Sequence, residues 1–213
     1  MPKPHDEIAD DVRSGTFVRR SRTVAVRDNG RHQWEKDRAR QPRTTRAATG
    51  VTEHDTGLTG DDLVFSARYR TIRAPGDLAS AFGVPEGTAL LERSYRTRHT
   101  ADPAPFGLVT SYLPYSLAAA NPDLLDEANE PWPGGTQNQL HTVGVEVDRV
   151  EERLTARPPA PEEARELGLP PGSAVILLRK TSYDLGDRVV EVSRIVLPAD
   201  RTELVFTTRL ERW

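Results

Sequence analysis

Three arginines lie close together in a segment with the residue types of a β-strand. The segment from Leu90 to Arg98 reads LLERSYRTR and contains Arg93, Arg96 and Arg98. Side chains alternate between the two faces of a strand, so Arg96 and Arg98 share one face. Guanidinium groups bind phosphate and carboxylate groups through two parallel hydrogen bonds. The spacing therefore predicts an anion-binding face, with a solvated outer face of the strand as the alternative.

A glycine pair is a second candidate for anion binding. Gly134, Gly135 and Thr136 precede a segment that we expect to be helical. Amide groups at the start of a helix attract anions, and a threonine there can contact the anion or cap the helix. The alternative is an ordinary N-cap that follows a loop.

One acidic residue is a third candidate. Glu191 lies in the segment VVEVS between Val190 and Val192. If the two valines face the core, Glu191 faces the opposite side of the strand. It then either accepts hydrogen bonds from a ligand or forms a cross-strand pair with Arg179.

Several kinds of chemistry are excluded by composition and motifs. The 213 residues include no cysteine, and the five histidines have no metal-ligand spacing. A thiol nucleophile, a disulfide and a thiolate zinc site are therefore excluded. Neither a G-x-S-x-G motif nor a glycine-rich phosphate loop with lysine is present. We predict no catalytic residue, no metal and no cofactor, and hence no enzyme.

The chain has the composition of a cytoplasmic globular protein. Hydrophobic residues make up 36% and charged residues 29%, and no apolar run approaches the length of about 18 residues that spans a membrane. Residues 1–50 have 12 basic and 7 acidic side chains, for a net charge of +5, and the remainder has −8. A basic segment of this kind either contacts an anionic polymer or is solvated. We expect residues 1–50 to be a partly disordered basic linker in which Trp34 docks on the domain that follows, residues 51–213.

The body of the chain contains an internal repeat. Residues 82–89 (FGVPEGTA) match residues 167–174 (LGLPPGSA), and a short helical segment precedes each copy. A strand, a polar turn and a returning strand that ends in proline follow each copy. The expected strands start at Ala89 and Ala174. The sequence therefore predicts a duplicated helix–hairpin unit.

Two further strands complete the predicted sheet. Residues 144–157 have valines at strand spacing, and residues 203–212 alternate between apolar and polar side chains. Helical segments are expected at 116–120, 122–128 and 136–143. Strands in one sheet with helices on one face give an α+β fold, and the crease between the two halves is a natural ligand site.

These motifs resemble the effector-binding (UTRA) domain of GntR-family transcription regulators of the HutC subfamily. The second half of the chain has the clearest resemblance, through RVEE at 149–152, LGLPPG at 167–172 and Asp200-Arg201. The first half matches through Ala74-Pro75 and residues 110–114 (TSYLP). The resemblance covers about residues 60–213. It implies a fold like that of chorismate lyase, a six-stranded antiparallel sheet with helices.

The N-terminal residues have a weaker resemblance to the same family. Gly15 to Val18 (GTFV) look like the end of the wing of a winged helix-turn-helix, and the residues before them have no recognition-helix pattern. This likeness makes Gly15, Thr16 and Arg19 candidates for DNA contact. DNA binding is expected only through a winged helix-turn-helix that is truncated or absent here.

The resemblance also suggests which residues hold an effector. Members of the family often bind sugar phosphates or other anions with arginines of this hairpin, and the acid at the position of Glu191 accepts hydrogen bonds from the effector. The spacing leaves open whether Arg96 and Arg98 or Thr97 and His99 face the cleft. The expected effector-binding residues are Arg93, Arg96, Arg98, Ser111, Gly135, Thr136, Tyr183, Glu191 and Arg201.

The favoured function is a ligand-sensing domain of a transcription regulator. It would form a homodimer, bind a small, sugar-phosphate-like anionic effector and control DNA binding. The alternatives are an enzyme like chorismate lyase and an interaction module that does not bind DNA.

Overall fold

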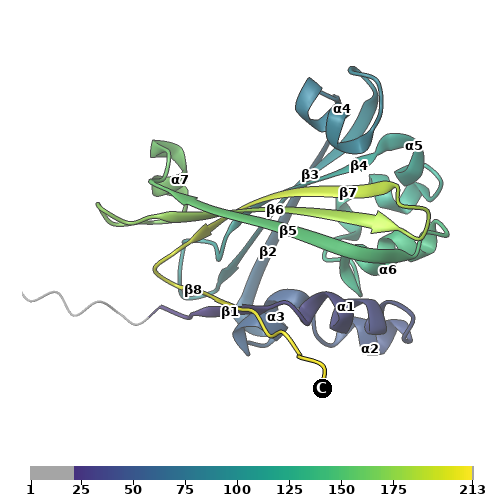
Figure 1. Cartoon of the computed structure of the whole chain (residues 1–213). Coiled ribbons are helices and arrows are strands. Elements are labelled where there is room, and N and C mark those ends of the chain that lie inside the picture. The colour runs from purple at the N-terminus through teal and green to yellow at the C-terminus, as the bar shows by residue number, and fades with distance from the viewer. Residues whose placement is uncertain (1–21, 213) are drawn as a thin grey trace, which may run out of the picture.

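The largest unit of the protein is a six-stranded antiparallel sheet. The computed structural model describes residues 22–212 and orders these strands β2-β3-β4-β7-β6-β5 (Figure 1). The strands are β2 (Leu63–Arg73), β3 (Ala89–His99), β4 (Leu108–Pro114), β5 (Val147–Arg157), β6 (Val175–Asp184) and β7 (Val189–Pro198). The predicted α+β class and six-stranded antiparallel sheet are confirmed.

The two predicted hairpins form the middle of this sheet. β3 pairs with β4, β6 pairs with β7, and the returning strands β4 and β7 pair with each other. The helices that precede the hairpins are α4 (Gly76–Phe82) and α7 (Pro161–Glu166). Gly83 and Gly168, at equivalent places just after these helices, have φ angles of 64° and 57°. Glycine adopts this left-handed conformation most easily, so the repeated glycine stops the helix in each copy.

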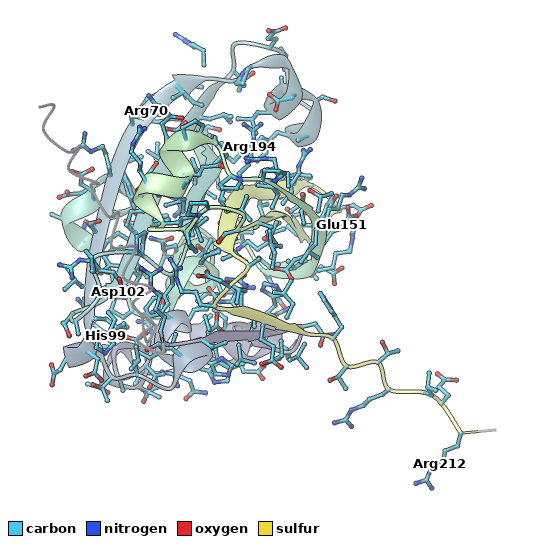
Figure 2. All side chains as sticks on the ribbon, turned by 90° about the vertical axis from the view of Figure 1, so that its left-hand side faces the viewer. Arg70, His99, Asp102, Glu151, Arg194 and Arg212 are labelled. Atoms are coloured by element: carbon cyan, nitrogen blue, oxygen red, sulfur yellow. The ribbon has the colours of Figure 1, made fainter. Side chains whose placement is uncertain are left out.

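The prediction for the sixth strand was wrong. Residues 203–212 do not join the main sheet, because β8 (Thr202–Val205) pairs in parallel with β1 (Ala25–Asp28). The segment after β8 extends away from the body toward Arg212 (Figure 2). The sixth strand is instead β2, which pairs with β3 along its whole length. An alternating pattern identifies a strand, but it does not identify the partner of that strand.

Helices cover both faces of the sheet, not one face as predicted. α4 packs on one face through Leu78 and Phe82, and α7 contacts the same face through Glu166, which pairs with Arg96. The opposite face is covered by α6 (Gly135–Thr142) and by the N-terminal helices, as Figure 1 shows. The remaining helices are α1 (Arg31–Ala39), α2 (Arg43–Ala47), α3 (Val51–Thr56) and α5 (Tyr115–Ala118), with short 3-10 turns at Gly60–Asp62, Pro122–Leu125 and Glu127–Asn129.

Each face of the sheet has its own apolar cluster near the ends of β3 and β4. Leu90 and Tyr112 pack with α4 on one face, whereas Leu91 and Leu113 pack with Leu140 of α6 on the other. Consecutive residues of one strand thus enter different clusters, as the alternation of side chains requires. None of the helices in the described residues combines the length and apolarity needed to cross a membrane.

Replacing Leu113 by alanine tests this packing. Its side chain is fully buried, so the Leu113→Ala substitution should lower the free energy of unfolding by about 3 kcal/mol through lost apolar contact and a cavity. Urea denaturation measures this change. The control is Leu185→Ala, because Leu185 is 70% exposed in a turn and its loss should change stability by about 0.5 kcal/mol or less. Equal effects of the two substitutions would contradict the packing.

Candidate functional site

A cavity of about 610 Å³ lies between the sheet and the N-terminal helices. Its floor is the face of the sheet that α6 also covers. Its other walls are formed by α1, α3, the start of α6 and the segment from Glu130 to Trp132. The volume is in the range of cavities that bind small organic molecules.

One row of polar side chains crosses the floor of the cavity. Strand register aligns one residue from each of the six strands. In spatial order the row is Tyr69, Arg93, Ser111, Ser193, Lys180 and Glu152. Three of its members, Ser111, Ser193 and Lys180, line the cavity.

Glu191 connects four members of this row. Its carboxylate accepts hydrogen bonds from Ser111 Oγ at 2.7 Å and Ser193 Oγ at 3.0 Å. Lys180 Nζ lies 2.8 Å from Glu191 Oε2, and Arg93 Nη2 lies 3.5 Å from Oε1. Burial alone raises the pKa of Glu191, but Lys180, Arg93 and the hydroxyl donors outweigh it and lower this pKa from 4.5 to about 2. Glu191 is therefore ionised at neutral pH.

Arg93 is buried directly behind the cavity wall. Its guanidinium donates to Gln139 Oε1 at 2.6 Å and to Ser111 Oγ at 2.8 Å, and both of these residues line the cavity. The side chain is fully buried. Arg93 thus fixes the positions of neutral groups that a ligand can touch, and it adds positive charge beneath them.

Glu130 forms a second polar group at the edge of the cavity. Its Oε1 accepts hydrogen bonds from the hydroxyls of Tyr69 and Tyr95 and from Gln139 Nε2, and its Oε2 accepts from the amide of Trp132. Burial raises the pKa of both tyrosines above the usual value, so both hydroxyls keep their protons and donate. The Glu130 side chain is therefore held in place by neutral hydrogen-bond donors.

Apolar side chains form the next row of the floor. Tyr95, Val109 and Ile195 are aligned across β3, β4 and β7, and all three line the cavity. Phe65 of β2 and Leu197 of β7 follow one step further along the strands. Successive residues on one face of a strand are about 7 Å apart. The floor therefore changes from polar to apolar over that distance.

The N-terminal helices are held onto the body by buried polar contacts. Arg31 of α1 donates to both oxygens of Asp55 in α3, at 3.2 and 2.8 Å. Glu35 Oε1 accepts from the amide of Gln137 at 3.2 Å, and Asn138 Nδ2 donates to the carbonyl of Ala39 at 2.6 Å. These contacts join α1 to the first turns of α6. Residues that were expected to be partly a linker thus form one wall of the cavity.

The structure brings several of the sequence-predicted site residues together. Ser111, Gly135, Thr136 and Glu191 line the cavity, and Arg93 lies just behind it. Glu191 pairs with Lys180 rather than with Arg179, the cross-strand partner that the sequence suggested. Trp34 also lines the cavity, and its ring lies 4.2 Å from that of His54. The prediction that Trp34 docks on the body agrees with this placement.

The other predicted site residues lie outside this cavity. Arg96 pairs with Glu166 of α7 on the opposite face, and Arg98 donates to the carbonyl of His99, whereas Thr97 lines the cavity. The register of β3 thus decides the question that the spacing left open. Tyr183 packs against the Arg149 guanidinium, 3.9 Å from the ring centroid.

Arg201 is buried but also lies apart from the cavity. Its guanidinium donates to the carbonyl of Leu167 at 2.6 Å and to that of Pro105 at 3.3 Å. Arg201 thus joins the C-terminal end of the chain to the first repeated half, through Pro105, and to the second, through Leu167. Gly15, Thr16 and Arg19 lie outside the described residues.

Sequence reasoning missed several residues of the cavity. Lys180, Gln139 and Glu130 received no role, and Val109 was not expected to form a binding surface. Lys180 could have been found from the alternation of β6, because it shares a face with Leu178 and Ser182. Gln139 and Glu130 have no comparable signal, since their positions depend on how α6 packs against the sheet.

Replacing Glu191 by glutamine tests the charge cluster. Glu191→Gln leaves Arg93 and Lys180 without their carboxylate, so stability at pH 7 should fall by about 3 kcal/mol. The ionised form of Glu191 stabilises the folded state above pH 4.5, and this contribution is lost as the pH falls toward 2. The difference between wild type and variant should therefore shrink between pH 4.5 and 2 in urea denaturation. A stability difference between wild type and variant that does not change with pH would contradict the ionised state of Glu191.

Replacing Asp55 by asparagine tests the attachment of the N-terminal helices. Asp55→Asn leaves Arg31 without its buried carboxylate, so α1 to α3 should detach more often. Trypsin should then cleave after Arg38, Arg43 or Arg46 at least tenfold faster than in wild type. Asp37→Asn is the matched control, because Asp37 is exposed on α1 and bonds only to Gln33 among the described residues. Equal cleavage of both variants would argue against this attachment.

Comparisons with known proteins identify the family. The family model of the UTRA domain matches residues 67–203, more than half of the chain. An uncharacterised HTH-type transcriptional regulator of Rhizobium meliloti is 31% identical over 187 residues, which cover 86% of this chain and 72% of the relative.

Solved structures have the same fold. A protein assigned to the GntR family of transcriptional regulators is similar with a TM-score of 0.65 and 24% identity, over 77% of this chain and 65% of that protein. The effector domain of PhnF from Mycobacterium smegmatis is similar with a TM-score of 0.56 and 22% identity, over 70% and 90% of the two chains. The family model and the Rhizobium relative show that the chain belongs to the UTRA domain family, and its sheet with repeated hairpins has the fold of the solved GntR-family structures.

Proposed function

We propose that this protein is the effector-sensing part of a HutC-type regulator and that its cavity binds a small anionic effector. The observation that carries the proposal is the cluster of Arg93, Lys180 and Glu191 beneath the cavity, which has two cations for one carboxylate. The Lys180 ammonium and the Arg93 guanidinium are positive charges with little access to water, and they attract an anion to this part of the floor.

Lys180 is the group that we expect to contact the anion. Its ammonium has three donors, and Glu191 is its only ion-pair partner among the described residues. The side chain is 14% exposed and lines the cavity, so its other donors can face a ligand. The remaining lining cations are already engaged: Arg27 and Arg31 lie beside Asp55, and Arg38 donates to the carbonyls of Thr45 and Thr49.

The start of α6 does not provide a free anion site of the kind that the glycine pair suggested. Glu35 of α1 accepts the amide hydrogen of Gln137, so a carboxylate of the chain itself occupies this helix end. A sugar phosphate, which the family resemblance suggests, is one member of the class of anions that Lys180 could hold.

We further propose that effector binding controls DNA binding by a winged helix-turn-helix, in a homodimer. Supporting this, the cavity is lined both by the sheet and by α1 and α3. A ligand that contacts both the sheet and these helices binds best when the helices are docked on the sheet. Binding therefore increases the fraction of molecules in which the N-terminal helices are docked. A binding role rather than a catalytic one agrees with the relatives, which are transcriptional regulators.

Native mass spectrometry tests effector binding. The chain is incubated with a bacterial metabolite extract, and we expect one small anionic molecule to stay bound. Lys180→Met should lose this molecule because it removes the donor that faces the cavity. The matched control is Lys36→Met, since Lys36 pairs with Glu146 and does not line the cavity. Unchanged circular dichroism checks that both variants fold.

Two outcomes would contradict the proposal. Wild-type protein that retains no small molecule would argue against a sensing role. A molecule that Lys180→Met retains as well as wild type would place the anion elsewhere.

A further inference from the structure

The order of side chains on the cavity floor indicates what kind of molecule fits there. Ser111, Ser193 and Lys180 form one polar row across β4, β7 and β6. Val109 and Ile195 form the next row on the same face of the same strands, with Tyr95 beside them. The two rows are about 7 Å apart.

The apolar part of the floor extends beyond this second row. Phe65 and Leu197 also line the cavity, one step further from Lys180 along β2 and β7. Phe106, from the connection between β3 and β4, lies at the same end. On the floor, ligand atoms more than about 7 Å from Lys180 along the strands therefore meet aliphatic and aromatic side chains, with Thr97 as a polar member, whereas the opposite wall from α1 and α3 is polar.

Such a surface suits an apolar ligand body and not a polyhydroxylated one. Hydroxyl groups of a sugar that face Val109, Ile195 and Leu197 would lose their hydrogen bonds to water without gaining partners from these three side chains, which is unfavourable. An alkyl or aromatic body would instead remove these side chains from water, and the burial of each CH₂ group would favour binding.

We propose that the effector is an amphipathic organic anion. Its carboxylate or phosphate group lies at Lys180 in the polar row, and its alkyl or aromatic body covers Val109, Ile195 and Leu197. This inference rests on the proposed function, and it narrows the effector class to anions with an apolar body, which it ranks above sugar phosphates. Val109 is then a specificity-determining residue, because it begins the apolar surface beside Ser111.

Titration calorimetry of the 213-residue chain tests the inference. The probes are butanoate, hexanoate and octanoate, benzoate and 3-phenylpropanoate, with glucose 6-phosphate and inorganic phosphate for comparison. The expected result is that Kd falls about fourfold for each added CH₂ in at least one of the two carboxylate series. Octanoate or 3-phenylpropanoate should bind at least tenfold more tightly than glucose 6-phosphate.

Two variants locate the apolar body. Val109→Asn should make Kd less dependent on chain length, because it replaces an apolar side chain beneath the ligand body by a polar amide. Val64→Asn should leave it unchanged, since Val64 is 38% exposed on the opposite face of β2. Lys180→Met should weaken every anion at least tenfold if the head group lies where we place it.

The outcomes separate this inference from the proposed function. If Kd is independent of chain length in both series while glucose 6-phosphate binds and is lost in Lys180→Met, the inference is overturned and effector sensing stands. If none of these anions binds to wild type but an anion without an apolar body is retained from the metabolite extract, the inference is overturned and effector sensing stands; if no molecule is retained either, both are overturned. Chain-length dependence that survives in Val109→Asn would also overturn the placement of the apolar body.

Discussion

The ionised carboxylate of Glu191 lies between the Arg93 guanidinium and the Lys180 ammonium, and the cavity floor depends on this arrangement. A charged residue in the middle of a sheet is costly unless its partners are close. Here the two cations come from β3 and β6, with Ser111 of β4 and Ser193 of β7 as additional donors. The carboxylate therefore holds the two cations in place. Without it, they would repel each other and the floor would lose its order.

Strand register puts these groups together, across the boundary between the two repeated hairpins. The two hairpins meet at β4 and β7, so Ser111 of the first half lies opposite Ser193 of the second. Because side chains alternate, the same register that aligns the polar row also aligns Val109 with Ile195 in the next row. A shift by one residue would turn both rows to the opposite face and remove the cavity lining.

The N-terminal helices extend the site beyond the part of the chain that matches the UTRA family model. That match begins at residue 67, whereas Trp34, Glu35 and Asp55 all line the cavity. These helices are short, and isolated helices of this length are unstable in water. Their order depends on contacts with the body, such as that of Glu35 with α6. Under the proposed function, this wall is the part of the cavity that an effector would stabilise.

The sequence by itself determined the fold class, the duplicated hairpins and the approximate bounds of their strands, because these follow from local alternation and from glycine and proline positions. It also identified Arg93, Ser111 and Glu191 as candidate site residues. Only the tertiary structure decided which strand completes the sheet, that Arg96 and Arg98 lie outside the cavity, with Arg96 paired to α7, and that Lys180 and Val109 line the cavity. The physical reason is that strand partners, and the face that each helix covers, depend on packing between segments far apart in the chain. A local pattern does not contain that information.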